Sequence, residues 1–315
     1  MTPLTDPPAG RDRSIVRRLR DLRVTELNTC FDAEDKVLWC LMQPRQRPCF
    51  TPKLLEDIAT LQRLITAAST ATAPAIDYLI LGSAVPGVFN LGGDLALFVN
   101  TIRSGDRAAL QRYARACVAV GHANYRSYND KVTTIALLEG DALGGGFECA
   151  LSCDILIAER HVKFSLPEII FNLFPGMGAY SFLSRRVGAY QAETIIRSGR
   201  SYSAQDMHDL GVIDAVVDSH TARQEIAALI AARRHNKGTM RALHQIRRRV
   251  NGVSLAEMND ITDLWVDTAM GLTDRDLRKM SHIAAAQDRL RTRAIPSAPA
   301  GQDGLPAPAA LIPAS

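Results

Sequence analysis

The chain has 315 residues, of which 47% are hydrophobic and 22% are charged, a composition ordinary for a globular protein with a sizeable core. The formal net charge of +4 is too small to indicate nucleic acid as a partner. No stretch approaches the roughly 20 apolar residues of a membrane span, and residues 1–10 lack the apolar run of a signal peptide. We therefore expect a cytoplasmic protein.

Composition shifts divide the chain into four parts. Disordered tails are predicted at residues 1–13 and 294–315, a catalytic core at 14–218 and a helical region at 219–293. Strands are predicted at 23–27, 36–42, 76–81, 132–138, 155–157, 162–165 and 212–217, with a turn at 32–35. Helices are expected from Thr51-Pro52, from 106 to about 129, after Gly145, over 179–187, from Ser203 to Gly211, and from 219 to 291 with breaks near Gly238 and Gly252. The alternation of strand and helix predicts an α/β fold with a largely parallel sheet.

Six cysteines are scattered along the chain. Cys149 and Cys153 lie four residues apart on one face of a predicted helix, which suits core packing better than zinc ligation. We expect reduced, mostly buried thiols, and neither a metal ion nor a cofactor. The lone His122 is expected to be a packed or solvated residue and not a catalyst.

Two glycine turns are candidates for binding an oxyanion. Gly144, Gly145 and Gly146 follow the apolar strand at 132–138 and open a helix, whose first N–H groups have no partner within the helix. A second turn at residues 92–94 repeats this order of strand end, glycine pair and helix start. One N–H from each turn can bind a single carbonyl oxygen. We expect Gly145 and, of the glycine pair, Gly92 to be these donors.

Two glutamates accompany the glycine turns. Glu148 lies one helical turn beyond Gly145, and Glu168 follows a proline at the end of a predicted strand. The apolar residues around Glu168 favour a raised pKa, which suits it to proton transfer near neutral pH. A serine mechanism is less attractive because no Gly-x-Ser-x-Gly elbow is present.

These motifs together resemble the crotonase (enoyl-CoA hydratase/isomerase) superfamily over roughly residues 22–290. The motifs are Gly-Gly-Gly-Phe-Glu148, Pro-Glu168 and Phe-Pro-Gly-Met-Gly178. Residues 89–98, 175–182 and 265–270 further resemble the bacterial diffusible-signal-factor synthases, which make cis-2-unsaturated fatty acid signals. The resemblance implies a crotonase-like ββα spiral core and a helical C-terminal region that supports trimers and covers the active site.

The resemblance also implies an activity and its partners. The implied reaction is dehydration of a 3-hydroxyacyl-acyl-carrier-protein thioester by Glu148 and Glu168, followed by hydrolysis of the thioester, which makes a quorum-sensing signal. Which of the two glutamates acts as the base and which as the acid is open. The acyl tail would lie among apolar residues. The candidates are Leu143, Gly144, Phe171, Leu173, Phe174, Met177, Trp265 and Met270, with Met177 and Trp265 the strongest.

Alternatives stay open at the level of sequence. One is an ordinary enoyl-CoA hydratase or isomerase acting on acyl-CoA, and another is a non-catalytic acyl-binding scaffold. A homotrimer and a regulatory sensor kinase are implied by the resemblance alone. The basic stretch at 233–249 contains no acidic residue. It predicts either a solvated helix face or a docking patch for an acyl carrier protein or for the phosphates of coenzyme A.

Overall fold

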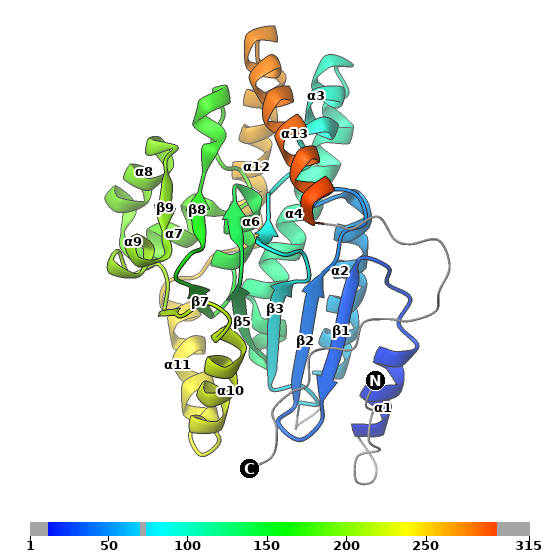
Figure 1. The fold of residues 1–315 in the computed structure, drawn as a ribbon, viewed down its shortest axis with the longest axis vertical. Helices are drawn as coiled ribbons and strands as arrows, with labels where there is room; N and C mark the ends of the chain where they lie inside the picture. The colour runs from blue at the N-terminus through cyan, green and yellow to red at the C-terminus, as the bar shows by residue number, and fades with distance from the viewer. Residues whose placement is uncertain (1–11, 70–73, 295–315) are drawn as a thin grey trace.

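A computed structural model describes residues 12–69 and 74–294, which form two sheets surrounded by helices (Figure 1). The larger sheet has the strand order β1-β2-β3-β5-β7-β10. All neighbouring strands in it are parallel except β1 and β2. Its strands are β1 (Leu27–Asp32), β2 (Val37–Met42), β3 (Tyr78–Ser83), β5 (Thr133–Leu138), β7 (Ile155–Glu159) and β10 (Ala215–Val217).

The smaller sheet has the order β4-β6-β8-β9, and its first three strands run parallel. In chain order, β3 leads to β4, β5 to β6 and β7 to β8, and each pair leads on to a helical segment. This repeated strand, strand, helix unit is the expected ββα spiral. The strands are β4 (Val88–Asn90), β6 (Asp141–Leu143), β8 (Lys163–Ser165) and β9 (Ser201–Ser203).

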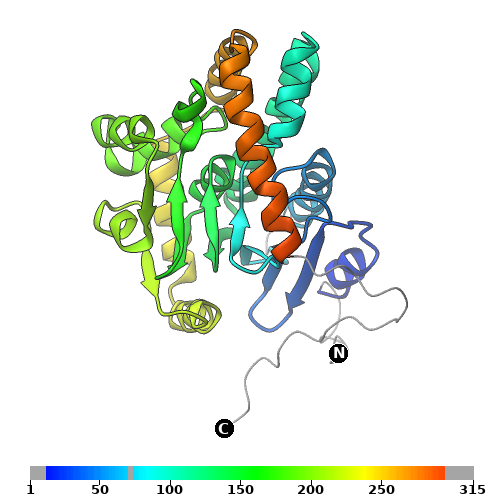
Figure 2. The same cartoon turned by 45° about the horizontal axis from the view of Figure 1, so that its top comes forward.

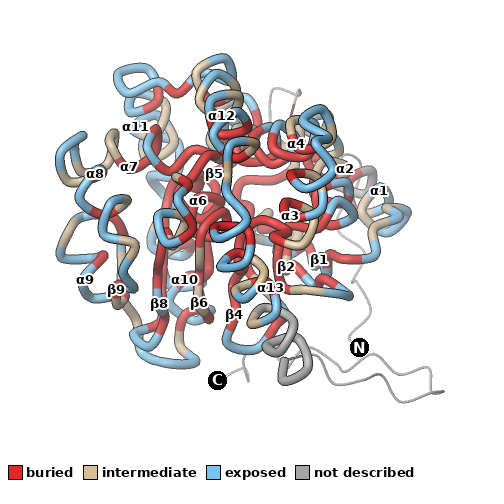
Figure 3. The backbone as a smooth tube through the Cα atoms, turned by 90° about the horizontal axis from the view of Figure 1, so that it is seen from above, coloured by how far each residue is buried: buried red, intermediate tan, exposed pale blue. Residues whose placement is uncertain are grey.

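Helices cover both faces of the larger sheet, and its strand β5 is buried along its whole length. Figure 3 shows buried backbone around β5 and α6, with exposed residues on the outer helices. In the core the helices are α2 (Pro52–Ala68), α3 (Leu95–Arg103), α4 (Arg107–Tyr125), α5 (Ser127–Asp130), α6 (Gly145–Leu151), η1 (Pro167–Phe171), α7 (Ala179–Val187), α8 (Ala189–Ser198) and α9 (Ala204–Asp209), preceded by α1 (Asp12–Arg20). The C-terminal region adds α10 (Ala222–Ala232), α11 (Lys237–Val250), α12 (Leu255–Met270) and α13 (Asp274–Ala294).

The C-terminal region returns to the core. Figure 2 shows α13 lying diagonally across the molecule, close to α3. Its predicted helical character is confirmed, with a further break at residues 271–273. Except for Asp12, Arg13 and Ala294, which belong to α1 and α13, the two expected tails lie outside the described residues. Within the described ranges, no helix is both long and apolar enough to span a membrane.

Two element boundaries differ from the predictions for physical reasons. The first strand, predicted at 23–27, lies instead at Leu27–Asp32, because the N–H groups of Thr25 and Glu26 donate to the carboxylate of Asp57 on α2. The long helix ends at Tyr125, because the chain enters the left-handed region at residues 127–130. Strand β6 was not predicted, because Asp141–Leu143 contains no β-branched or aromatic residue.

Several basic side chains of the 233–249 stretch pair with acidic residues of the core. Lys237 and Arg241 both pair with Asp77, the residue before β3. Arg248, which is 5% exposed, pairs with Asp130 and Asp154. Arg241 and Arg248 therefore attach α11 to the core and are not part of a solvated face, whereas Lys237 and Arg249 are exposed.

Asp154 is the buried centre of this attachment, and its loss should destabilise the fold. Its carboxylate also accepts from the hydroxyl of Ser127 and the N–H of Thr134. Because Asp154→Ala leaves a buried guanidinium short of a partner, we expect the free energy of unfolding in urea to fall by roughly 3–5 kcal/mol. Asp267→Ala, which breaks an exposed pair with Arg107, is the control and should cost less than about 1 kcal/mol. Equal losses in the two variants would contradict this assignment.

Candidate active site

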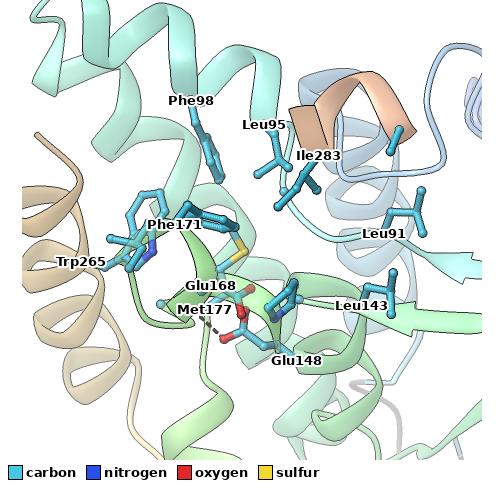
Figure 4. A pocket seen from close by; sticks show the side chains of 17 residues that line it. Leu91, Leu95, Phe98, Leu143, Glu148, Glu168, Phe171, Met177, Trp265 and Ile283 are labelled. Atoms are coloured by element: carbon cyan, nitrogen blue, oxygen red, sulfur yellow. Dashed lines mark hydrogen bonds between the residues drawn. The ribbon is translucent and has the colours of Figure 1, made fainter. Parts of the chain in front are cut away.

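The ends of β4, β6 and β8 meet at one edge of the smaller sheet, and a cavity of about 140 Å³ opens there (Figure 4). Parallel neighbours end at the same edge, so the segments that follow them are brought together. These segments are the 92–94 turn, the 144–146 turn and the start of η1. The cavity is lined by Leu91, Gly93, Leu95, Phe98, Leu143, Gly144, Gly145, Glu148, Pro167, Glu168, Phe171, Leu173, Gly176, Met177, Trp265, Ile283 and Ala286.

The two glycine turns are in contact. A Cβ added to Gly92 would lie 2.8 Å from the backbone nitrogen of Gly145, and a Cβ on Gly145 would lie 3.5 Å from that of Gly93. Gly145 is the first residue of α6, so its N–H has no acceptor within the helix. The preference for Gly92 is wrong, because its N–H donates to the side-chain oxygen of Asn90 at 2.8 Å. Gly93 lines the cavity instead.

Glu148 is held by one backbone amide just before α7 and by the first amide of that helix. One of its carboxylate oxygens accepts from the N–H of Met177 at 2.8 Å and from that of Ala179 at 2.9 Å. Ala179 begins α7, so the carboxylate lies at the positive end of that helix. The side chain is 3% exposed. Glu148 is therefore a buried carboxylate with a fixed position and two charge-assisted hydrogen bonds.

Glu168 lies on η1 and faces the same cavity, where Figure 4 shows its carboxyl close to that of Glu148. One of its oxygens is buried without a hydrogen-bond partner among the described residues. The other would lie 2.7 Å from a Cβ on Gly144, whose φ of +50° also favours glycine. The absent Cβ of Gly144 leaves the space that the carboxyl of Glu168 occupies.

The two carboxyls have perturbed proton affinities. Burial raises the pKa of Glu148, and the two backbone N–H groups oppose part of that rise. Burial raises the pKa of Glu168 further, because the charge of Glu148 adds to the effect and backbone hydrogen bonding offsets less of it. The two groups titrate as a pair. Both carboxyls therefore hold protons to a higher pH than a free glutamate does.

Apolar side chains form the rest of the cavity. Some of them come from α3, α12 and α13, which are distant in sequence from the glycine turns. Phe98 on α3 packs edge-on against Trp265 on α12, with ring centroids 5.1 Å apart. Trp265 also covers Gly176, where a Cβ would lie 2.4 Å from the ring. Ile283 of α13 reaches the cavity from above in Figure 4. The expected covering of the site by the C-terminal helices is thus present within one chain.

Most of the expected lining residues lie where the sequence placed them. Leu143, Gly144, Phe171, Leu173, Met177 and Trp265 line the cavity. Phe174 and Met270 do not line it and instead pack, partly buried, against the core. Sequence reasoning missed Leu91, Leu95 and Phe98, although all three flank the Gly92-Gly93 pair and could have been found from it. Ile283 had no local signal, since only the path of α13 brings it to the site.

The described residues contain no cluster of side chains suited to a metal ion. All six cysteines are free, and all except Cys30 are buried. His122 is half-buried, and its ring contacts the carbonyl oxygen of Val253 at 3.3 Å. It is therefore a packed residue away from the cavity, as expected. The chemistry of this site rests on two carboxyls and backbone amides.

Comparison with known proteins agrees with this architecture. The model of the enoyl-CoA hydratase/isomerase family matches residues 41–305. The chain belongs to this family. The expected membership of the crotonase superfamily is thereby confirmed.

Relatives of this family match the chain at moderate identity. The fatty acid oxidation complex subunit alpha of Aliivibrio fischeri is 31% identical over 166 residues, which are 52% of this chain and 23% of that protein. The structure of DspI from Pseudomonas aeruginosa is 26% identical with a TM-score of 0.62, over 72% of this chain and 82% of that one. Enoyl-CoA hydratase from Bacillus halodurans, at 21% identity, shares the fold with a TM-score of 0.67, over 82% of this chain and 100% of that one.

The raised pKa of Glu168 makes a prediction about stability. Between the ordinary glutamate pKa of about 4.3 and its raised value, the native state binds more protons than the unfolded state, so the free energy of unfolding falls as pH rises. Glu168→Gln cannot ionise, so its unfolding free energy should fall less steeply across this window. The measurement is urea unfolding at a series of pH values. Glu225→Gln, an exposed position on α10, should keep the wild-type slope, and an equally steep Glu168→Gln would refute the burial argument.

Proposed function

We propose that this protein dehydrates a 3-hydroxyacyl-acyl-carrier-protein thioester to a cis-2-enoyl thioester and then hydrolyses the thioester to release a cis-2-unsaturated fatty acid signal. One observation carries the proposal. The buried carboxyls of Glu148 and Glu168 face a single apolar cavity beside the amides of Gly93 and Gly145. The likeness of residues 89–98, 175–182 and 265–270 to the signal synthases supports the choice of substrate.

Dehydration uses the proton shared by the two carboxyls. The N–H groups of Gly93 and Gly145 bind the thioester oxygen and stabilise the negative charge that develops when C2 loses its proton. The ionised carboxylate takes that proton, and the protonated carboxyl gives its own to the hydroxyl that leaves C3 as water. The pair ends with one proton, now on the other glutamate. The charge and proton count of the site are therefore restored without a metal.

Hydrolysis uses the same amides. Water activated by a glutamate attacks the thioester carbon, and the oxygen becomes a tetrahedral oxyanion in the position that the enolate oxygen held. Collapse of that intermediate expels the thiol of the carrier and leaves the free acid. The apolar walls at Phe98, Phe171 and Trp265 bind the alkyl tail, so tail length contributes to specificity. A homotrimer in the cytoplasm and control by a sensor kinase are part of this proposal through the resemblance to the signal synthases.

An ordinary enoyl-CoA hydratase is the second candidate, because the family model and the fatty acid oxidation relatives favour chemistry on acyl-CoA. The chain spans only about a quarter of the length of those relatives. The two glutamates serve both reactions, so the cavity does not separate them. The products do.

The product made from 3-hydroxydodecanoyl carrier protein tests the proposal. Mass spectrometry, with a cis/trans-resolving separation, should detect free cis-2-dodecenoic acid. Glu148→Gln and Glu168→Gln should each lower its rate of formation by about 10²-fold or more, since each removes one partner of the proton transfer. Release of trans-2-enoyl thioester alone would favour the hydratase. Unchanged carrier-protein substrate, together with no hydration of 2-enoyl-CoA by the wild-type protein, would reject both enzymes and favour the scaffold.

The rate should also show a bell-shaped dependence on pH. Activity requires the singly protonated pair, and burial raises the pKa of both glutamates, so the acidic limb should lie above the range of an ordinary glutamate. The measurement is kcat for acid release across the range in which the carrier thioester is chemically stable. A profile that is flat through neutrality would show that the proton shared by Glu148 and Glu168 does not control the rate.

A further inference from the structure

The 92–94 turn is fixed from behind by hydrogen bonds that the proposed reaction does not use. The N–H of Phe50 donates to the carbonyl oxygen of Gly92 at 2.8 Å. The N–H of Asp94 donates to the hydroxyl oxygen of Tyr113 at 3.0 Å, and that hydroxyl donates to the carbonyl oxygen of Phe50. Phe50 and Tyr113 thus hold the peptide groups on both sides of Gly93.

The direction of these bonds determines where the N–H of Gly93 points. The carbonyl of Gly92 and the N–H of Gly93 belong to one planar trans peptide, so they point in opposite directions. Because the carbonyl points toward Phe50, the N–H of Gly93 points away from it. The next peptide is held in turn, since its N–H is bound by Tyr113. Gly93 has no Cβ to restrain it, so its orientation depends on these two neighbours.

Tyr113 is itself rigidly held. It lies on α4, is 6% exposed, and packs edge-on against Phe98 with ring centroids 5.4 Å apart. Phe98 covers Gly93, where a Cβ would lie 2.5 Å from the tip of its ring. Burial keeps the pKa of Tyr113 well above its ordinary value, so its hydroxyl is a permanent donor. A single hydroxyl therefore bridges α4, the 92–94 turn and the segment before α2.

We propose that Tyr113 is a positioning residue that aims the N–H of Gly93 at the thioester oxygen. This inference rests on the proposed function, in which that N–H is one of two donors to the oxyanion. Tyr113 contacts neither substrate nor the glutamates. It acts on the rate by holding the turn, because a preorganised donor does not have to be reoriented as charge develops.

Tyr113→Phe separates the hydroxyl from the ring. The aromatic contact with Phe98 is kept, while the N–H of Asp94 and the carbonyl of Phe50 lose their partner. Complete loss of an oxyanion donor lowers kcat by about 10²–10³-fold, so a loosened donor should lower kcat by about 10- to 100-fold. KM should change by less than about twofold, because the acyl cavity is intact.

Tyr125→Phe is the matched control on the same helix. The hydroxyl of Tyr125 also bridges two backbone groups, donating to the carbonyl of Asn251 at 2.9 Å and accepting from the N–H of Val253 at 3.1 Å. Its ring packs against Phe182 and does not line the cavity. Both variants lose a hydroxyl that bridges two backbone groups, and the hydroxyl of Tyr113 also bonds the thiol of Cys117. Urea unfolding of each variant shows how much stability is lost. The kcat of Tyr125→Phe should stay within about twofold of wild type.

A spectroscopic measurement makes the proposal independent of turnover. S-(3-hydroxydodecanoyl)pantetheine with a ¹³C-labelled carbonyl is bound to the inactive Glu148→Gln/Glu168→Gln protein, and the infrared carbonyl band is recorded. The band should shift to lower frequency than in water, and adding Tyr113→Phe should remove about half of that shift. Adding Tyr125→Phe should leave the shift unchanged.

The outcomes are distinct. Failure of the wild-type protein to process the carrier substrate, with a carbonyl shift that depends on Tyr113, would reject the proposed reaction and support the positioning role. An unaltered shift and kcat in Tyr113→Phe would reject the positioning role alone. Equal losses of kcat in the two tyrosine variants would show that Tyr113 supports the fold and does not position Gly93. No shift even with Tyr113 present would reject both proposals.

Discussion

The parallel pairing of β4, β6 and β8 is the constraint on which the site depends. These strands are only three residues long, and each follows a longer strand of the larger sheet. Their register aligns Asn90 with Ala142, and Leu143 with Ser165. The residues immediately after each strand therefore meet at one edge. A shift of register would separate the two glycine turns from each other and from Glu168.

Burial of two carboxyls in one apolar cavity opposes folding and prepares the site for proton transfer. Two amides at the start of α7 stabilise the ionised form of Glu148. Glu168 has no such support on one of its oxygens. This difference gives two chemically identical side chains different proton affinities, which is what acid and base catalysis within one site requires. The stability lost at this pair is a cost that functional sites commonly carry.

Helix α6 connects this site to the attachment of the C-terminal region. Its first amide lies in the cavity, and the segment just after it ends at Asp154, which binds Ser127, Thr134 and Arg248. The same helical region that is attached there by α11 returns through α12 and α13 to cover the acyl cavity. The basic residues of α11 that pair with Asp77, Asp130 and Asp154 thus help to position the helices that close the site.

The sequence by itself determined the local parts of this protein. Glycines beside strand ends, a proline before Glu168 and helical spacing after Thr51 are local patterns, so they identified the turns, both glutamates and most elements. Tertiary structure decided what depends on distant segments. The N–H of Gly92 was lost as a donor because Asn90 binds it, the acidic partners of Arg241 and Arg248 lie 164 and 94 residues away along the chain, and Ile283 reaches the cavity only through the path of α13. Local sequence carries no record of such contacts, because they exist only once the sheets have formed and the C-terminal helices have packed across them.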